Sequence, residues 1–222
     1  MSSTSTAVTA AHFAYLAERT VPEDAFLADL KAAANEAGIP PIWISPEQAS
    51  LMQILLKAAG ARRVVEVGTL AGYSAIAMAR ALPPRADGGL LRTIELDPKH
   101  ASFAADWCGR SDAADRIEVH RGAGAEVLAG FEDDSADAAF LDADKGGYPV
   151  YLEHCLRIVR SGGLILVDNA FAFGQLFDEN PTDREVPAVR AFNDLMARTP
   201  GVHGVIVPMG DGLWVAVVER KG

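Results

Sequence analysis

Short apolar runs recur along most of the chain, and several lack the alternation of apolar and polar positions that marks a half-exposed strand. The runs within Asp137–Leu141 and Leu164–Val167 are apolar at successive positions, which is typical of strands buried on both faces of a parallel sheet. The pattern predicts strands at Arg63–Val67, Leu90–Glu95, Ile117–His120, Asp137–Leu141, Leu164–Val167, Gly204–Val207 and Leu213–Val218. Segments with helical spacing alternate with them and predict helices at Tyr73–Ala81, Lys99–Arg110, Ala125–Ala129, Pro149–Ile158 and Val186–Arg198.

The order of these elements predicts the fold class. Strands that alternate with helices form parallel sheets with helices on both faces, but only Pro208–Gly212 separates the last two strands. This link is too short for a parallel crossover, so the last two strands should form an antiparallel hairpin. We therefore expect an α/β protein with a Rossmann-like, seven-stranded, mostly parallel sheet, an antiparallel C-terminal edge hairpin and helices on both faces.

The N-terminal part predicts helices only. Apolar positions within 12–37 predict two helices that are broken near Pro22, and an extended, proline-containing connector follows. A third helix begins well at Ser45, which can cap it and is followed by a proline. We expect one domain over 1–222, in which 1–44 form a helical cap and connector.

Composition and charge restrict the partners. Half of the residues are hydrophobic, 23% are charged, and the net charge is −10. An acidic protein repels nucleic-acid phosphates and anionic membranes, so we expect neither as a partner. The start of the chain lacks the pattern of a signal peptide, and no apolar stretch reaches membrane-spanning length. The two cysteines, Cys108 and Cys155, lack metal-type spacing, and a reducing cytoplasm is the expected location.

Candidate chemistry collects where two apolar runs end in carboxylates. Asp142 follows one run and Asp168-Asn169 follows the other. If the runs are neighbouring parallel strands, these side chains emerge together at the carboxyl edge of the sheet. Three oxygen-bearing side chains there can hold a hard divalent cation such as Mg²⁺, with Lys145 close by. Helix capping after the strands is the structural alternative for these residues.

Other residues at the same sheet edge predict a ligand site. Gly68 follows the first strand, Glu95 ends the second, and Gly122 follows the third, and ligands of open α/β sheets bind at this edge. Glu95 is placed to accept hydrogen bonds from a ribose, with Asp97 as a rival. The carboxylates Glu66 and Asp142 would repel a pyrophosphate but attract a cation. A ribose-bearing, positively charged ligand is indicated, and S-adenosylmethionine fits that description.

Several motifs also resemble a known family, the metal-dependent O-methyltransferases of the catechol and caffeoyl-CoA type. The resemblance extends from about Ile44 to the C-terminus. It rests on Val65–Ser74, Thr93–Pro98, Phe140–Lys145, Asp168-Asn169 and Pro208–Gly212.

The resemblance implies roles for individual residues. Lys145 falls on the lysine that helps to deprotonate the acceptor hydroxyl, and Asp142 acts beside it. A homodimer is also implied. The metal ligands would be Asp142, Asp168 and Asn169. The cofactor would be held by Glu66, Gly68, Ser74, Glu95, Gly124 and Asp142, with the backbone near Ile44 and Thr69.

The acceptor side of the site departs from the family pattern. Phe171 and Phe173 follow the Asp-Asn pair where relatives usually have a tryptophan and a polar residue. Trp43 and Trp214 are further candidates for the substrate wall, and Gln175–Pro187 predicts either a lid or a surface loop. Basic residues that would attract an acyl-CoA are few near the N-terminus, so we expect a small phenol with vicinal hydroxyls, a catechol-like acceptor.

Other functions stay open at this point. An NAD-dependent oxidoreductase would use a similar sheet, although the first turn lacks the third glycine of its fingerprint. A non-catalytic S-adenosylmethionine-binding module would not need the polar groups at the strand ends. A metal-independent methyltransferase would use the acids only for structure, and a caffeoyl-CoA-type enzyme would take a larger acceptor.

Overall fold

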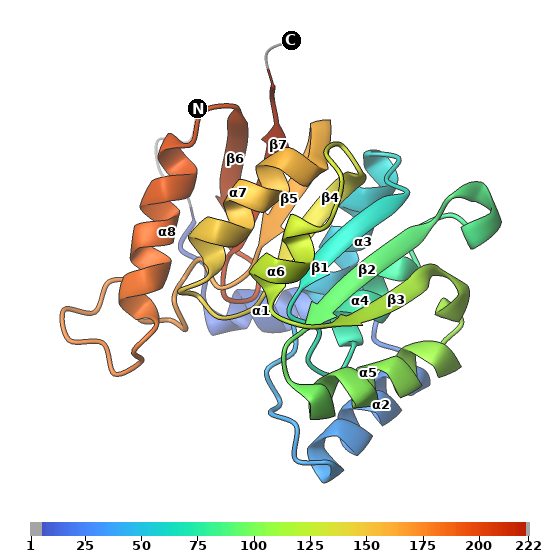
Figure 1. Cartoon of the computed structure of the whole chain (residues 1–222). Coiled ribbons are helices and arrows are strands. Elements are labelled where there is room, and N and C mark those ends of the chain that lie inside the picture. The colour runs from blue at the N-terminus through green and yellow to red at the C-terminus, as the bar shows by residue number, and fades with distance from the viewer. Residues whose placement is uncertain (1–5, 221–222) are drawn as a thin grey trace.

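The computed structural model describes residues 6–220, so residues 1–5 and 221–222 of the expected domain lie outside the description. Helices and strands alternate after an N-terminal helical part (Figure 1). The strands are β1 (Arg63–Val67), β2 (Leu90–Glu95), β3 (Ile117–Arg121), β4 (Ala136–Leu141), β5 (Val159–Val167), β6 (Val202–Val207) and β7 (Leu213–Val218). The helices are α1 (Ala10–Ala17), α2 (Ala25–Glu36), α3 (Pro46–Ala58), α4 (Tyr73–Ala79), α5 (Pro98–Arg110), α6 (Gly124–Ala129), α7 (Tyr148–Ile158) and α8 (Val186–Arg198), with short 3₁₀ turns η1 (Arg85–Asp87) and η2 (Ala114–Arg116).

The seven described strands form one sheet in the order β3-β2-β1-β4-β5-β7-β6. Strands β1 to β5 pair in parallel, whereas β7 is antiparallel to both β5 and β6. The final hairpin therefore closes one edge of a parallel sheet, which confirms the predicted fold class. Within residues 6–220, no helix is long and apolar enough to cross a membrane.

Two hydrophobic layers cover the two faces of the sheet because successive side chains of a strand point to opposite faces. In β1, Val64 packs in a core with α2 to α5, and Val65 packs in a second core with α6 to α8. Figure 1 shows α6 and α7 in front of the sheet and α3 and α4 behind it. The central strands β1, β2 and β4 are thus buried on both sides, as their apolar runs predict, whereas the edge strands β3 and β6 are more exposed.

The start of α3 confirms the predicted cap. The Ser45 side chain accepts a hydrogen bond from the Gln48 backbone N–H at 3.2 Å, and Pro46 occupies the first turn. Because Pro46 has no N–H and a preset φ, it suits a position where the N–H would lack a helical partner. This cap fixes where α3 begins, and α3 in turn brings Gln48 to the sheet edge.

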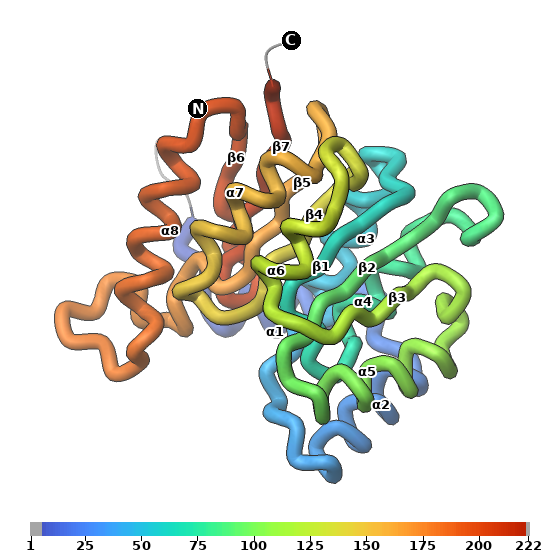
Figure 2. Tube along the Cα trace, viewed as in Figure 1, coloured from blue at the N-terminus to red at the C-terminus, as the bar shows by residue number. Residues whose placement is uncertain are grey.

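Most boundaries lie within two residues of the sequence prediction, and one strand differs more. Strand β5 begins at Val159 instead of Leu164, because pairing with Ala136 of β4 extends it across the Ser-Gly-Gly segment, with an irregular register. The expected lid or surface loop Gln175–Pro187 ends earlier, since α8 starts at Val186. Figure 2 shows this β5–α8 loop projecting beside one end of α8. The Arg190 side chain donates to three of its carbonyls, those of Gln175, Leu176 and Asp178.

Candidate active site

Acidic side chains from neighbouring strands point to one face of the sheet. Glu66 of β1 is the register partner of Phe140 in β4, so Asp142, two residues further along, points to the same face. The same alternation brings Glu95 of β2 and Asp168 after β5 to this side. The acids therefore converge on the α3 and α4 side of the carboxyl edge.

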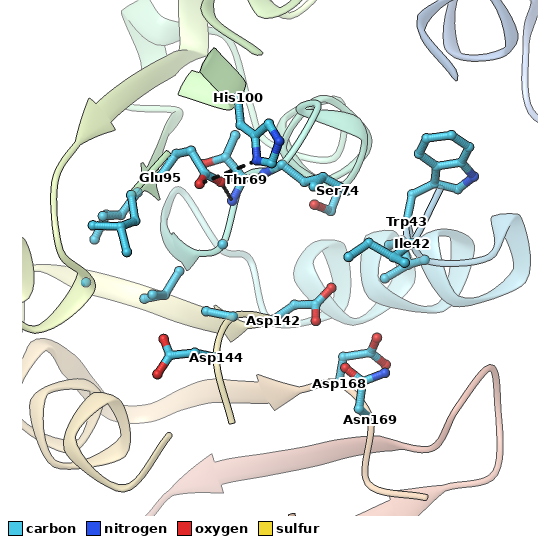
Figure 3. Close-up of a pocket in the computed structure, with 18 of the residues that line it drawn as sticks. Ile42, Trp43, Thr69, Ser74, Glu95, His100, Asp142, Asp144, Asp168 and Asn169 are labelled. Atoms are coloured by element: carbon cyan, nitrogen blue, oxygen red, sulfur yellow. Dashed lines mark hydrogen bonds and ion pairs between the residues drawn. The ribbon is translucent and has the colours of Figure 1, made fainter. Parts of the chain in front are cut away.

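A cavity of about 1020 Å³ opens at this edge. It lies between the ends of β1, β2, β4 and β5, the connector before α3 and the β6–β7 turn. Figure 3 shows Glu95 and Thr69 toward one end, Asp168 and Asn169 toward the other, and Asp142 between them. Its charged wall is mainly acidic. The acids are Glu95, Asp97, Asp142, Asp144, Asp168, Glu185 and Asp211, beside Lys145 and His100.

One end of the cavity is organised by Glu95. Its Oε2 accepts hydrogen bonds from the backbone N–H groups of Thr69 (3.1 Å) and Leu70 (2.8 Å). The rival acid, Asp97, also lies in the wall, but its Oδ1 accepts from the first N–H groups of α5 and caps that helix. These hydrogen bonds lower the pKa of Asp97. The Oε1 of Glu95 accepts from the Asp97 backbone N–H at 2.9 Å, so three backbone N–H groups hold Glu95 in the cavity wall while Asp97 serves as a helix cap.

The turn after β1 lies against the end of β4. Gly68 has φ +96°, and a Cβ atom there would lie 1.9 Å from the backbone oxygen of Asp142. Only glycine tolerates both this conformation and this approach. Gly68 thus allows the turn after β1 to lie in direct contact with Asp142 at the end of β4.

Glu66, one of the residues expected to hold the cofactor, lies behind the cavity wall instead of within it. Its side chain is fully buried, and its Oε1 accepts a hydrogen bond from Ser74 Oγ at the start of α4. Its Oε2 has no hydrogen-bond partner. Burial raises the pKa of Glu66 to about 8, although the Ser74 hydrogen bond opposes the shift. Glu66 therefore supports Ser74, which does line the cavity.

Asp142, Asp168 and Asn169 meet at the other end of the cavity, as the sequence predicts. The Gln48 side chain donates from Nε2 to Asp168 Oδ1 at 2.6 Å. Burial and the neighbouring Asp142 carboxylate raise the pKa of Asp168. A divalent cation would favour the ionised form of Asp168 that the neighbouring carboxylate disfavours, so the residues present fit such an ion.

The third side-chain oxygen of this set would come from an amide. Within residues 6–220, no three His, Cys, Asp or Glu side chains gather as a metal-binding group. A cation between Asp142 and Asp168 would therefore use the Asn169 side-chain oxygen. Asn169 has φ +64°, a left-handed conformation that asparagine adopts more readily than most residues.

Lys145 is buried, in contrast to an ordinary surface lysine, with only 4% of its surface exposed. Its Nζ donates to the Tyr148 hydroxyl at 2.6 Å and lies 3.2 Å from Asp142 Oδ1. Burial and the nearby acids raise the pKa of Tyr148 well above its usual value. Tyr148 thus stays a neutral hydroxyl that holds the ammonium group at the cavity wall.

The structure brings two of the four expected substrate residues to the cavity. Trp43 and Phe173 line the cavity, but the described wall includes neither Phe171 nor Trp214. Trp214 packs in the α6–α8 core, where its Nε1 donates to Asn193 at 2.7 Å. Phe171 packs against Gly212, since a Cβ there would lie 2.8 Å from its ring. The expected cofactor residues Ile44, Gly68, Thr69 and Gly124 do line the cavity.

Sequence reasoning missed several polar residues of the site. Gln48, Asp144, Glu185 and Asp211 line the cavity, and none of them is among the expected site residues. Gln48 carried one signal, a polar residue on the otherwise apolar face of α3. The others lie in loops, where only the fold shows which side chains turn inward.

Comparisons with known proteins agree with this geometry. The family model described as O-methyltransferase matches residues 17–220. A catechol O-methyltransferase from Niastella koreensis is 38% identical over 205 residues, which cover 89% of this chain and 91% of that protein. A catechol O-methyltransferase from Mycobacterium tuberculosis is 34% identical and covers 94% and 90%.

A solved structure has a similar fold. The O-methyltransferase from Bacillus cereus in complex with SAH superposes with a TM-score of 0.83 and 33% identity, over 94% of this chain and 97% of that one. The family model, the relatives and the fold agree over nearly the whole described chain. The protein therefore belongs to the O-methyltransferase family.

Proposed function

We propose that this O-methyltransferase uses S-adenosylmethionine and a divalent cation, Mg²⁺ by preference, to methylate one hydroxyl of a small catechol-like acceptor. The observation that carries the proposal is the two-ended cavity. Glu95 lines one end of the cavity, and Asp142, Asp168 and Asn169 line the other. A methyl donor and a metal-bound acceptor would thus meet near Asp142.

The cofactor half suits S-adenosylmethionine. SAH is the product that S-adenosylmethionine leaves after it gives up its methyl group, and the Bacillus cereus relative is in complex with SAH. Glu95 can accept hydrogen bonds from ribose hydroxyls, while the acidic wall favours the sulfonium and ammonium charges. Ser74, supported by Glu66, offers a hydroxyl at the start of α4.

The metal half would activate the acceptor. A divalent cation held by Asp142, Asp168 and Asn169 would lower the pKa of a bound hydroxyl and orient it. Gln48 holds Asp168 in place through its 2.6 Å hydrogen bond. Lys145, held by Tyr148 and Asp142, lies beside the proposed cation site, where as the neutral amine it would accept the proton of the acceptor hydroxyl. The chain aligns the two reacting centres, which is a large contribution to a displacement reaction.

The acceptor is inferred from the wall and from relatives. Two of the similar proteins are named catechol O-methyltransferase, and a vicinal diol can occupy two positions on one cation. Trp43 and Phe173 supply aromatic surface for a ring. The acidic residues Asp144 and Glu185 would repel the phosphates of an acyl-CoA. These features favour a free phenol over a CoA thioester.

A labelled-methyl assay tests the proposal. We expect transfer to catechol, weak transfer to a phenol with one hydroxyl, and none to caffeoyl-CoA. A chelator should abolish transfer, and Mg²⁺ should restore it. Lys145→Met should reduce kcat by about 10²- to 10⁴-fold, the usual contribution of a proton-transfer group, with unchanged SAH affinity. Full activity in chelator would contradict the metal, and SAH binding without transfer to any acceptor would indicate a binding module.

A further inference from the structure

The turn between β6 and β7 contacts the proposed metal ligands from outside the cation site. Asp211 in this turn accepts a hydrogen bond from Asn169 Nδ2 at 3.2 Å through its Oδ2. The same carboxylate accepts from the backbone N–H groups of Phe173 (2.7 Å) and Gly174 (3.2 Å). The mechanism above gives Asp211 no role, although three hydrogen bonds converge on it.

Asn169 has an orientation problem that the two aspartates do not have. A carboxylate presents oxygen whichever way it turns, but an amide presents either oxygen or NH₂. Hard cations bind the oxygen and are repelled by the NH₂ group. Because only two of the proposed cation ligands are carboxylates, a turned amide would leave the cation without its third side-chain ligand.

Asp211 settles this orientation. Its carboxylate only accepts hydrogen bonds, so the NH₂ group of Asn169 is held on the Asp211 side and the amide oxygen is left for the cavity. The backbone reinforces the arrangement, since the carbonyls of Asp211 and Gly212 accept from the N–H groups of Phe171 and Ala170 at 2.8 and 2.9 Å. The turn is therefore fixed against the segment that carries Asn169.

We propose that Asp211 is a positioning residue that completes the cation site by holding the Asn169 amide with its oxygen toward the cavity. The inference rests on the proposed cation site and assigns a role to a residue that does not touch the ion. Ligand-orienting partners of this kind typically change metal affinity by about 10- to 100-fold when removed.

A simple loop anchor is the competing explanation, because Asp211 also holds the N–H groups of Phe173 and Gly174. An Asn169→Asp background separates the two roles. Aspartate at 169 presents oxygen in either orientation, so it needs no orienting partner, whereas the loop contacts of Asp211 stay the same. Aspartate also tolerates the left-handed backbone at this position.

The experiment measures Mn²⁺ affinity by electron paramagnetic resonance in four proteins: the wild type, Asp211→Ala, Asn169→Asp and the double variant. We expect Asp211→Ala to weaken Mn²⁺ binding by about 10-fold or more in the wild-type background. In the Asn169→Asp background the same change should alter binding by less than about 2-fold, or tighten it because a like charge is removed. SAH affinity and melting temperature serve as controls for folding.

The outcomes distinguish this inference from the proposed function. An equal loss of Mn²⁺ affinity in both backgrounds would make Asp211 a loop anchor only and overturn the inference, while the cation site stands. Unchanged affinity in Asp211→Ala would overturn it as well. A wild-type protein that binds no Mn²⁺ would refute the cation site and the inference together.

Discussion

At the residue scale, burial changes the chemistry of carboxyl groups that the sequence shows only as acids. Glu66 is fully buried with one unpartnered oxygen, and its pKa rises to about 8. Asp142 stands at the cavity wall, beside Lys145. Two acids of the same sheet face thus differ in role, because one lies below the ligand cavity and the other lies within it.

The raised pKa of Glu66 predicts a pH-dependent stability. Between pH 4.5 and 8 the folded protein keeps a proton on Glu66 that the unfolded chain has lost, so stability falls as pH rises. The slope from this group is at most about 1.4 kcal/mol per pH unit. We expect Glu66→Gln to remove this part of the slope in denaturant unfolding of the ligand-free protein at pH 5 to 8. A constant stability difference between the two proteins over this range would contradict the raised pKa.

At the element scale, two neighbouring acids have different roles, because one ends a strand at the cavity and the other caps the following helix. Glu95 ends β2 and accepts hydrogen bonds from the turn that follows β1, whereas Asp97 caps α5. The sequence places both acids within one motif and favours Glu95 because of its position at the strand end. In the structure, three backbone N–H groups hold Glu95 in the cavity wall, whereas Asp97 Oδ1 accepts from the first N–H groups of α5.

These different roles predict different effects of two matched substitutions. Glu95→Gln should weaken SAH binding by about 10-fold or more, since hydrogen bonds to a charged group contribute about 1.5–3 kcal/mol. Asp97→Asn keeps a capping side chain but removes the negative charge at the N-terminus of α5, so it should lower the melting temperature slightly and leave SAH affinity within about 2-fold. Calorimetric titration and thermal melting measure the two effects. Weaker SAH binding in Asp97→Asn than in Glu95→Gln would reverse the assignment.

At the scale of the whole molecule, the N-terminal helix packs only loosely on the described chain, where it contacts α3. None of the residues of α1 is buried, although Phe13, Tyr15 and Leu16 lie on it. A helix of eight residues is marginal in water without packing. Val21 and Ile54, also exposed, line one hollow close to α2 and α3.

We propose that a second copy of the chain covers this apolar surface and forms a homodimer. Light scattering should then give twice the chain mass of 23.5 kDa. Phe13→Glu should shift the protein toward the monomer, whereas Glu18→Gln, on the exposed end of the same segment, should not. A wild-type monomer at micromolar concentration would refute the dimer.

The sequence by itself determined the sheet, because apolar runs and helical spacing report burial directly, and it determined which strand ends carry acids. It also placed Asp142, Asp168 and Asn169 together, since parallel strands end at one edge. Only the tertiary structure decided which side chains turn inward from loops. Glu185 and Asp211 enter the cavity wall, while Phe171 and Trp214 pack elsewhere, because loop direction depends on contacts between segments distant in sequence. The tertiary structure also decided that Glu66 is buried below the cavity while the other acids line its wall, since the burial of a side chain depends on the segments that cover it.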